Sequence, residues 1–471
     1  MTTAVAAPEQ AWWREPTRAQ WTTFLAAWAG WVLDAFDFTI YLLAMADIMK
    51  EFGVGAVATS ISVTLTLLLR LAGGVGSGWL ADRYGRKLPL VISLVWFAVC
   101  DGAVAFAPSF AWVLAFRTLF GLGMGAQWTA GATLAMENWP ARSRGIASGI
   151  LQGSWAIGYI VAALVYWAIE PTLGWRPLFM IAAVPALLAL PIWFFVPESP
   201  DWQKAKAQKA NVTLADLKAE KVILRVVWAS VLWATSFAVY YGLSGMWPAL
   251  LRTTFQLGAR EIAWLVITFN LGMMAGAITW GTTASKKGAV FALIVPLVVL
   301  LPALPLYVGG WSFGAPAVAG IPNALWLGAF VAGATGAGIS GVTPMLLTSL
   351  FPARVRGLSV GVVYHVGALL AAPSSTLVAW MGGSIGLGNA IVALVAVAAI
   401  VTVLILVFRP AGALPTSALG TASNPNPGAS LTSADSTASV WVPHCFDSTQ
   451  VRSLSWTGSS RNQRRKFSGV R

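Results

Sequence analysis

Long apolar runs joined by short polar connections follow one another along this chain up to position 409. A helix of about 20 apolar residues crosses the roughly 30 Å hydrocarbon layer of a membrane. Twelve runs have this length, so the pattern predicts an all-α membrane protein with twelve transmembrane helices. We expect these helices at 21–45, 57–80, 88–107, 111–136, 145–168, 176–196, 225–249, 260–283, 288–309, 322–346, 356–381 and 385–408.

The composition is also typical of a membrane protein. Of the 471 residues, 57% are hydrophobic and only 10% are charged, a balance far from that of soluble domains. Residues 1–20 lack the basic region and short apolar core of a secretory signal, so we expect the first run to be retained as a helix. Cys100 and Cys445 form neither a disulfide framework nor a metal-binding spacing, and we expect no metal and no cofactor.

The net charge of +13 could indicate a nucleic-acid partner, but the placement of the charges points to membrane topology instead. With the N-terminus inside, most Lys and Arg residues of the connections face the cytoplasm, as the positive-inside rule requires. We therefore expect a multi-pass protein of the cell inner (plasma) membrane, surrounded by lipid, with both termini cytoplasmic. The inward-facing residues are Arg83, Arg86, Lys87, Arg142, Arg144, Lys204, Lys206, Lys209, Lys218, Lys221, Arg225, Lys286, Lys287, Arg354 and Arg356, against Lys50, Arg176, Arg252 and Arg260 outside.

An internal repeat divides the chain. The segment 139–145 (WPARSRG) recurs as 351–357 (FPARVRG), 212 residues later and again before an apolar run. A displacement of six helices keeps the direction of the chain, which predicts two parallel halves. We expect a cytoplasmic N-terminal segment at 1–20, a six-helix bundle at 21–196, a Lys-rich cytoplasmic linker at 197–224, a second six-helix bundle at 225–409 and a cytoplasmic tail at 410–471. The tail holds too few apolar residues for a core, and we expect it to be disordered.

The connection between the second and third runs, 78–87, reads GWLADRYGRK. It resembles the signature loop between helices 2 and 3 of major facilitator superfamily transporters. The resemblance implies two pseudo-symmetric six-helix halves that work by alternating access. A weaker copy, 281–288 (GTTASKKG), keeps the glycines but has Ser285 where the first half has Asp82.

Alternating charges at the inner ends of the helices predict a network that latches the outward-open state. The carboxylate of the signature loop is also suited to bind a helix N-terminus. The expected gating residues are Asp82, Arg83, Arg86, Glu137, Arg142 and Glu198.

Ionisable groups inside apolar runs cost at least ~2.5 kcal/mol each and are functional candidates. Asp34 and Asp37 share one helical face, where burial and mutual repulsion both favour a bound proton. We interpret them as proton-coupling residues; the alternative is a packing pair satisfied by a neighbouring helix. Arg70 lies mid-span and requires an anion. We expect a substrate carboxylate to compete with Asp34 or Asp37 for this guanidinium. The alternative is a permanent ion pair between Arg70 and one of the two aspartates.

Other polar groups in the runs are weaker candidates. Asp101 and Arg117 are expected at similar depth on neighbouring helices, which predicts a structural ion pair. A lone histidine on an apolar helix is more often a packing residue than a proton carrier. With Arg70, the expected substrate-binding residues are Gln127, Trp128, Tyr240, Tyr241, Asn270 and His365.

Within the superfamily, the first half resembles the sialate:proton symporter family of sialic acid transporters and lactate permeases. The resemblance rests on 33–38 (LDAFDF), 63–74 (VTLTLLLRLAGG), 137–145 (ENWPARSRG) and 149–159 (GILQGSWAIGY); aromatic acid:proton symporters share the first of these segments. It implies a monomer that imports an organic acid anion with protons, with the mid-span arginine as anion contact. Two departures matter, since Gln-Trp replaces the family's Glu-Tyr at 127–128 and 240–248 (YYGLSGMWP) has no ionisable group of the lactate permease kind.

The aromatic residues at these departures favour a small or aromatic carboxylate over a sugar acid. A monocarboxylate such as lactate is the first expectation, and an aromatic acid the alternative. Proton-driven efflux is a further possibility, supported by Arg117 with glycines four and eight residues later. A transport-like nutrient sensor is a rival of another class. An enzyme is disfavoured because the two histidines are far apart and no nucleophile is paired with a base.

Overall fold

The computed structural model describes residues 11–54, 56–208, 221–310 and 323–414. The predicted tail from 415 onward and the part of the predicted linker at 209–220 lie outside these residues. The helices are α1 (Arg18–Phe52), α2 (Ala56–Tyr84), α3 (Lys87–Ala105), α4 (Phe110–Asn138), α5 (Arg144–Leu173), α6 (Arg176–Ala183), α7 (Ala189–Phe195), α8 (Pro200–Ala207), α10 (Val222–Ser244), α11 (Trp247–Thr253), α12 (Ala259–Lys287), α13 (Ala289–Tyr307), α14 (Asn323–Ala332), α15 (Thr343–Leu350), α16 (Arg356–Ala371), α17 (Ser374–Ile385) and α18 (Leu387–Val407).

The predicted runs are helical. Within the described residues, ten helical segments are long and apolar enough to cross a membrane. The two remaining predicted spans correspond to α4, which is 29 residues long, and to α6 and α7, which a 3-10 turn at Val184–Leu188 joins into one broken helix. The all-α fold expected from the apolar pattern is therefore confirmed.

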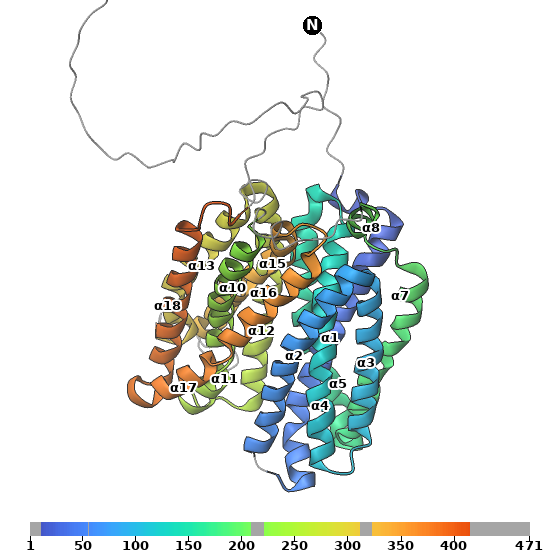
Figure 1. The fold of residues 1–471 in the computed structure, drawn as a ribbon. Coiled ribbons are helices and arrows are strands. Elements are labelled where there is room, and N and C mark those ends of the chain that lie inside the picture. Colours follow the sequence, from blue (N-terminus) through green and yellow to red (C-terminus); the bar gives the residue numbers. More distant parts are fainter. Residues whose placement is uncertain (1–10, 55, 209–220, 311–322, 415–471) are drawn as a thin grey trace, which may run out of the picture. The chain divides into compact units, whose positions relative to one another are not determined.

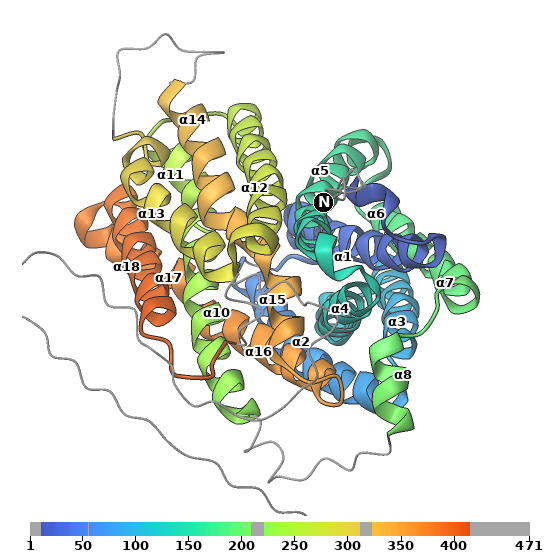
Figure 2. The same ribbon diagram turned by 90° about the horizontal axis from the view of Figure 1, so that it is seen from above.

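The helices form two groups, α1 to α7 and α10 to α18, which Figure 2 shows on opposite sides of the view. Across the boundary, α2 packs against α16 and α5 packs against α12 (Figure 1). A Cβ atom on Gly78 would lie 2.4 Å from the backbone oxygen of Gly357, and one on Gly149 would lie 2.3 Å from that of Ala277. Glycine at these positions lets the backbones of the two halves touch, as small residues do between membrane helices.

The signature loop and its weaker copy each contain a glycine with a positive φ angle. Gly85, between α2 and α3, has φ 112°, and Gly288, between α12 and α13, has φ 88°. Only glycine adopts such angles without strain. The repeated glycine is therefore explained by the turn itself, which redirects the chain at equivalent places in the two halves.

The C-terminal end of α1 is hydrogen-bonded to the start of α6 through Glu51. Arg176 donates a hydrogen bond to Glu51 at 2.5 Å, and the indole of Trp175 donates one at 2.7 Å. Burial acts to raise the pKa of Glu51, but these two hydrogen bonds outweigh it and the pKa is lowered. A lowered pKa in the folded state gives stability that is present at neutral pH and lost as the pH falls through that pKa.

We therefore expect acid to lower the unfolding temperature of the native chain more steeply than that of a Glu51→Gln variant. Thermal unfolding of the detergent-solubilised proteins between about pH 7 and about pH 4 measures the two slopes. Identical slopes would show that Glu51 contributes no pH-dependent stability.

Candidate functional site

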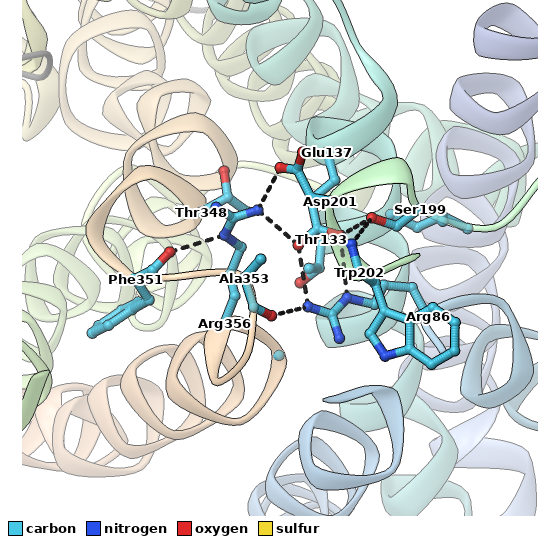
Figure 3. A network of polar contacts seen from close by, with 12 residues as sticks. Arg86, Thr133, Glu137, Ser199, Asp201, Trp202, Thr348, Phe351, Ala353 and Arg356 are labelled. Carbon is cyan, nitrogen blue, oxygen red and sulfur yellow. Dashed lines mark hydrogen bonds and ion pairs between the residues drawn. The ribbon is translucent and has the colours of Figure 1, made fainter. Parts of the chain in front are cut away.

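Charged side chains of both halves meet at the end of the bundle that carries the signature loop (Figure 3). Arg86 is fully buried, and its guanidinium contacts Glu137 at 3.1 Å and Asp82 at 2.8 Å. From the other half, Arg356 reaches the same Glu137 at 2.8 Å. Arg86 also donates to the backbone oxygen of Ala353 at 2.6 Å. We call these five residues the latch, and the end of the bundle that holds them the latch end.

The latch is held by buried charge. Burial works to lower the pKa of Arg86, but the carboxylates of Glu137 and Asp82 outweigh it and the pKa is raised. The side chain of Glu137 is 0% exposed and serves arginines from both halves. Removing one partner of a buried ion pair typically costs about 3–5 kcal/mol, because the other charge stays buried without compensation. The contact between the halves therefore depends strongly on Glu137.

A Glu137→Gln variant is expected to open the latch more often. The amide hydrogens of the first turn of α16 should then exchange with deuterium faster, because they are protected only while the halves are in contact. Asp201→Asn is the matched control. Asp201 also pairs with Arg356, but its side chain is 40% exposed, and exposed pairs contribute little. Equal exchange in the two variants would contradict the role of Glu137.

Each copy of the signature loop caps a helix of the opposite half. Asp82 accepts hydrogen bonds from the backbone nitrogens of Gly357 at 2.9 Å and Leu358 at 2.8 Å, in the first turn of α16. Ser285 accepts one from the backbone nitrogen of Gly145 at 2.9 Å, in the first turn of α5. A carboxylate also interacts with the positive end of the helix dipole, which a hydroxyl does not. The two contacts are therefore alike in geometry and unequal in charge.

The linker adds contacts through α8 and the residues before it. Glu198 accepts hydrogen bonds from the backbone nitrogens of Arg86 at 2.9 Å and Lys87 at 3.2 Å, at the start of α3. Further bonds join Ser199 to Glu137, the indole of Trp202 to the backbone oxygen of Asp82, and Asp201 to Arg356. The linker helix is thus bonded to both halves at the latch end.

Two expected gating residues have exposed side chains. The guanidinium of Arg83 lies 5.5 Å from the ring centre of Trp79 and 5.6 Å from that of Tyr84. It forms no ion pair with any residue in the described ranges, because the helix turns it outward, and this corrects the prediction that it joins the network. Arg142 is exposed, in the short turn before α5. Arg356 and Asp201 were not among the sequence candidates, although the first is the repeat partner of Arg144.

A cavity of about 950 Å³, counting the space that opens to solvent, lies between the two halves. The polar groups of its wall include the side chains of Gln152, Ser236, Ser340 and Thr343 and the hydroxyl groups of four tyrosines. Aromatic side chains from both halves line it, namely Trp31, Phe38, Trp155, Tyr159, Trp233, Phe237, Tyr240, Tyr241 and Tyr364. Such a cavity suits a small ligand with an apolar body and few polar groups.

Arg70 is the one charged side chain among the residues that line this cavity. Its guanidinium lies between two rings, 5.9 Å from the centre of Trp31 and 5.8 Å from that of Tyr364. Its Nε has no hydrogen-bond partner within the described part of the chain, and the same is true of all four carboxylate oxygens of Asp34 and Asp37. The expected ion pair between Arg70 and one of these aspartates is therefore not formed in this conformation, which leaves the guanidinium available to a ligand.

Part of the cavity wall is an interrupted helix. After α14 the chain forms a π-helical turn, Gly333–Ala337, and a 3-10 turn, Gly338–Val342, before α15 begins. Gly336, Ser340 and Thr343 from this stretch line the cavity. Mid-helix π and 3-10 turns often mark hinges at functional sites. The irregular turns are therefore part of the cavity wall itself.

Tyr240 and Tyr241 line the cavity, whereas four other expected contacts do not. Trp128 lies in a second layer, with its ring stacked on that of Tyr364 at a centroid distance of 3.4 Å. A direct substrate contact was expected of Trp128, and in this conformation it is not part of the cavity wall. The cavity wall is nevertheless aromatic, as expected, because Tyr240, Tyr241 and further aromatic side chains line it.

The remaining three are occupied inside the helix packing. His365 Nε2 lies 3.2 Å from both the backbone oxygen of Gly125 and the hydroxyl of Thr129. Gln127 bonds a serine of α3, and Asn270 donates to the backbone oxygen one turn earlier in α12. Gln127 Nε2 and His365 Nδ1 have no hydrogen-bond partner among the described residues. Gln127, Asn270 and His365 were expected in the substrate site, and none of them lines the cavity in this conformation.

A second group of ionisable residues is buried inside the N-terminal half. Asp34 and Asp37 of α1 are both 0% exposed. Asp101 of α3 accepts a hydrogen bond from Arg117 of α4 at 3.2 Å, and both are buried. Arg117 does not line the cavity. Arg117 and Asp101 therefore meet as the ion pair that was expected at this depth.

Asp34 lies electrostatically between the two sites. The charge of Arg70, in the cavity wall, and the charge of Arg117 both act on it. Asp37 interacts most strongly with Asp101 and with Asp34. On α1, Asp34 also follows the cavity residue Trp31 by three positions, so the two share one side of the helix. A change of charge at Arg70, for example when an anion binds, therefore acts electrostatically on Asp34.

Comparisons with known proteins agree with this arrangement. Residues 27–250 match the family described as Major Facilitator Superfamily. The chain is 29% identical over 390 residues to the cis,cis-muconate transport protein of Acinetobacter baylyi, which covers 78% of this chain and 89% of that protein. It is 27% identical over 381 residues to the sialic acid transporter NanX of Escherichia coli, with 80% and 91% covered. Among solved structures, the proton:xylose symporter XylE matches with a TM-score of 0.69 at 18% identity, over 85% of this chain and 98% of that one.

Proposed function

This chain belongs to the major facilitator superfamily, and from that premise we propose that it imports an organic acid anion together with protons. The observation that carries the proposal is Arg70. It is the one charged side chain in the cavity wall, and in this conformation no carboxylate of the described residues binds it. A guanidinium in an apolar, membrane-buried cavity needs an anion, and a carboxylate matches its geometry with two parallel hydrogen bonds.

The relatives support the same class of substrate. Their names specify muconate and sialic acid, which are both organic acids. The wall of the present cavity is mostly apolar and rich in aromatic rings, so we favour a compact or aromatic acid over a polyhydroxylated sugar acid. A monocarboxylate such as lactate fits the single cation, and an aromatic acid fits both the cation and the rings around it.

Proton coupling is assigned to Asp34 and Asp37. Two fully buried carboxyl groups without hydrogen-bond partners in the described structure are costly when ionised. The Arg70 charge acts on Asp34, so an anion bound to Arg70 changes how readily Asp34 holds its proton. Loading the anion and loading the proton then favour each other, which is the requirement for symport.

The positive-inside bias assigns the latch end to the cytoplasm of the inner membrane, with both termini on that side. The closed latch then corresponds to a conformation in which the substrate cavity is shut toward the cytoplasm. Opening the latch and closing the opposite end would release the substrate inward. We expect one chain to carry out this cycle as a monomer.

Uptake of labelled lactate and labelled benzoate by cells that express the chain tests the proposal. Uptake at acidic pH that collapses when a protonophore is added is the expected result for at least one of the two acids. Benzoate as the better substrate would identify an aromatic acid symporter. Export of the acid against its concentration gradient while protons enter, or no movement of either acid by a correctly inserted protein, would contradict proton-coupled import of this substrate class.

A further inference from the structure

Tyr364 of α16 brings the C-terminal half into contact with Arg70. The centre of its ring lies 5.8 Å from the guanidinium carbon of Arg70, which belongs to α2 of the N-terminal half. The other ring beside this guanidinium, Trp31 at 5.9 Å, is on α1 and therefore in the same half as Arg70. Of these two rings, that of Tyr364 is the one that links Arg70 to the opposite half.

Further contacts of Tyr364 cross the same boundary. Its ring is stacked on that of Trp128 of α4, with 3.4 Å between the ring centres and 17° between the ring planes. A side-chain hydrogen bond joins Tyr364 to Gln152 of α5, and the indole of Trp128 donates to the same glutamine at 3.4 Å. Tyr364 is only 4% exposed. Three helices of the N-terminal half, α2, α4 and α5, therefore hold one buried side chain of the other half.

Tyr364 lies between the anion site and the latch. It follows Arg356 by eight residues on α16, and Arg70 precedes Asp82 by twelve residues on α2. At the rise of an α-helix, these spacings place Tyr364 about 12 Å and Arg70 about 18 Å from the latch. The ring of Tyr364 is also part of the cavity wall. It is therefore placed to respond to a ligand on one side and to the separation of the halves on the other.

We propose that Tyr364 couples substrate binding to the opening of the latch, as a positioning residue that acts through Arg70. The coupling rests on the proposed anion site at this arginine. A cation attracts the electron-rich face of an aromatic ring, most strongly where water is excluded. While the cavity is empty, the charge of Arg70 holds Tyr364, and with it α16, against the N-terminal half. A bound carboxylate neutralises the guanidinium and weakens this attraction.

The direction of the effect follows from the position of the contact. Opening the latch separates α16 from α2 and breaks the contact between Tyr364 and Arg70. The contact therefore stabilises the latched conformation more in the empty chain than in the loaded one. A ligand shifts an equilibrium by its different affinity for the two states, and the anion binds better where Arg70 is not shared with the ring. The loaded chain then opens more readily than the empty one, which is the order that import requires.

Deuterium exchange in the first turn of α16, measured without any acid, tests the contact itself. Arg70→Gln removes the cation and Tyr364→Leu removes the ring, and each should speed this exchange by about 2- to 30-fold, the range of a cation–π contact. The double variant should be no faster than Tyr364→Leu alone, because both changes remove the same contact. Tyr364→Phe is the matched control. It keeps the ring and loses only the hydroxyl group, so its exchange should stay close to that of the native chain.

Saturating benzoate provides the second arm, with its binding measured separately by equilibrium titration. Benzoate should speed exchange in the first turn of α16 in the native chain and in Tyr364→Phe. In Tyr364→Leu it should still bind but leave the exchange nearly unchanged. A native chain that binds neither benzoate nor lactate would contradict the anion site, whereas the acid-free arm would still decide whether Arg70 holds Tyr364.

Three results would overturn the proposal. The first is a native exchange rate in Arg70→Gln or in Tyr364→Leu. The second is exchange in Tyr364→Phe as fast as that in Tyr364→Leu, because the ring would then have no role. The third is an increase that extends equally to the start of α6, at the opposite end of the N-terminal half, because it would show general loosening of the fold.

Discussion

Replacing Arg70 by glutamine is expected to weaken substrate binding by about 100-fold or more. The variant loses the charge and the paired hydrogen bonds to a carboxylate, and each hydrogen bond to a charged group contributes about 1.5–3 kcal/mol. Every 1.4 kcal/mol corresponds to about tenfold in affinity. No other cation lines the cavity in the described structure, so no neighbouring side chain can take over.

Concentration-dependent uptake by reconstituted protein measures this effect. Arg83→Gln is the matched control, because Arg83 lies on the same helix but stacks on Trp79 and Tyr84 away from the cavity. An Arg70→Lys variant keeps the charge and loses the fork geometry, so it should fall between the native chain and Arg70→Gln. An unchanged apparent affinity for the substrate in Arg70→Gln would contradict the role of Arg70 as the anion contact.

The second large effect is expected from the double variant Asp34→Asn plus Asp37→Asn. Without an ionisable group at these positions, substrate binding no longer couples to a proton, and a proton gradient cannot drive accumulation. Net uptake against a gradient should therefore be lost, while exchange of labelled for unlabelled substrate should persist. The single variant Asp34→Asn should resemble the double variant more closely than Asp37→Asn does, because the charge of Arg70 acts on Asp34.

Accumulation and exchange in proteoliposomes, measured between about pH 5.5 and about pH 8, separate these outcomes. Asp47→Asn is the control on the same helix, since Asp47 accepts a hydrogen bond from Tyr166 away from the buried group. A double variant that accumulates substrate with the native dependence on pH would contradict the assignment of the proton site.

The latch could be inferred from sequence because it is built from motifs that occur twice. The two glycine turns and the repeat at 139–145 and 351–357 bring charges to one end of the bundle. Asp82 was expected at a helix N-terminus and lies at that of α16. Arg356 was not among the expected gating residues, although it occupies the position equivalent to Arg144 in the repeat.

The cavity wall could be inferred only in part. Arg70, Tyr240 and Tyr241 stood out by charge or by place in a motif. Polarity within an apolar helix does not show which way a side chain faces, and so Gln127 and Asn270 were assigned to the cavity although both bond inside the helix packing. Trp31, by contrast, precedes Asp34 by three residues on the same side of the helix, and this spacing alone favours a position near the cavity.

Proton movement driven by substrate tests the central claim most directly. Proteoliposomes that contain the native chain are placed in weakly buffered medium without an imposed pH gradient, and a saturating amount of the acid anion identified by the uptake assay is added. The account predicts that the external medium becomes alkaline as anion and proton enter together, and that the Arg70→Gln protein gives no such change. Uptake of the anion by the native chain without any alkalinisation would contradict proton-coupled import.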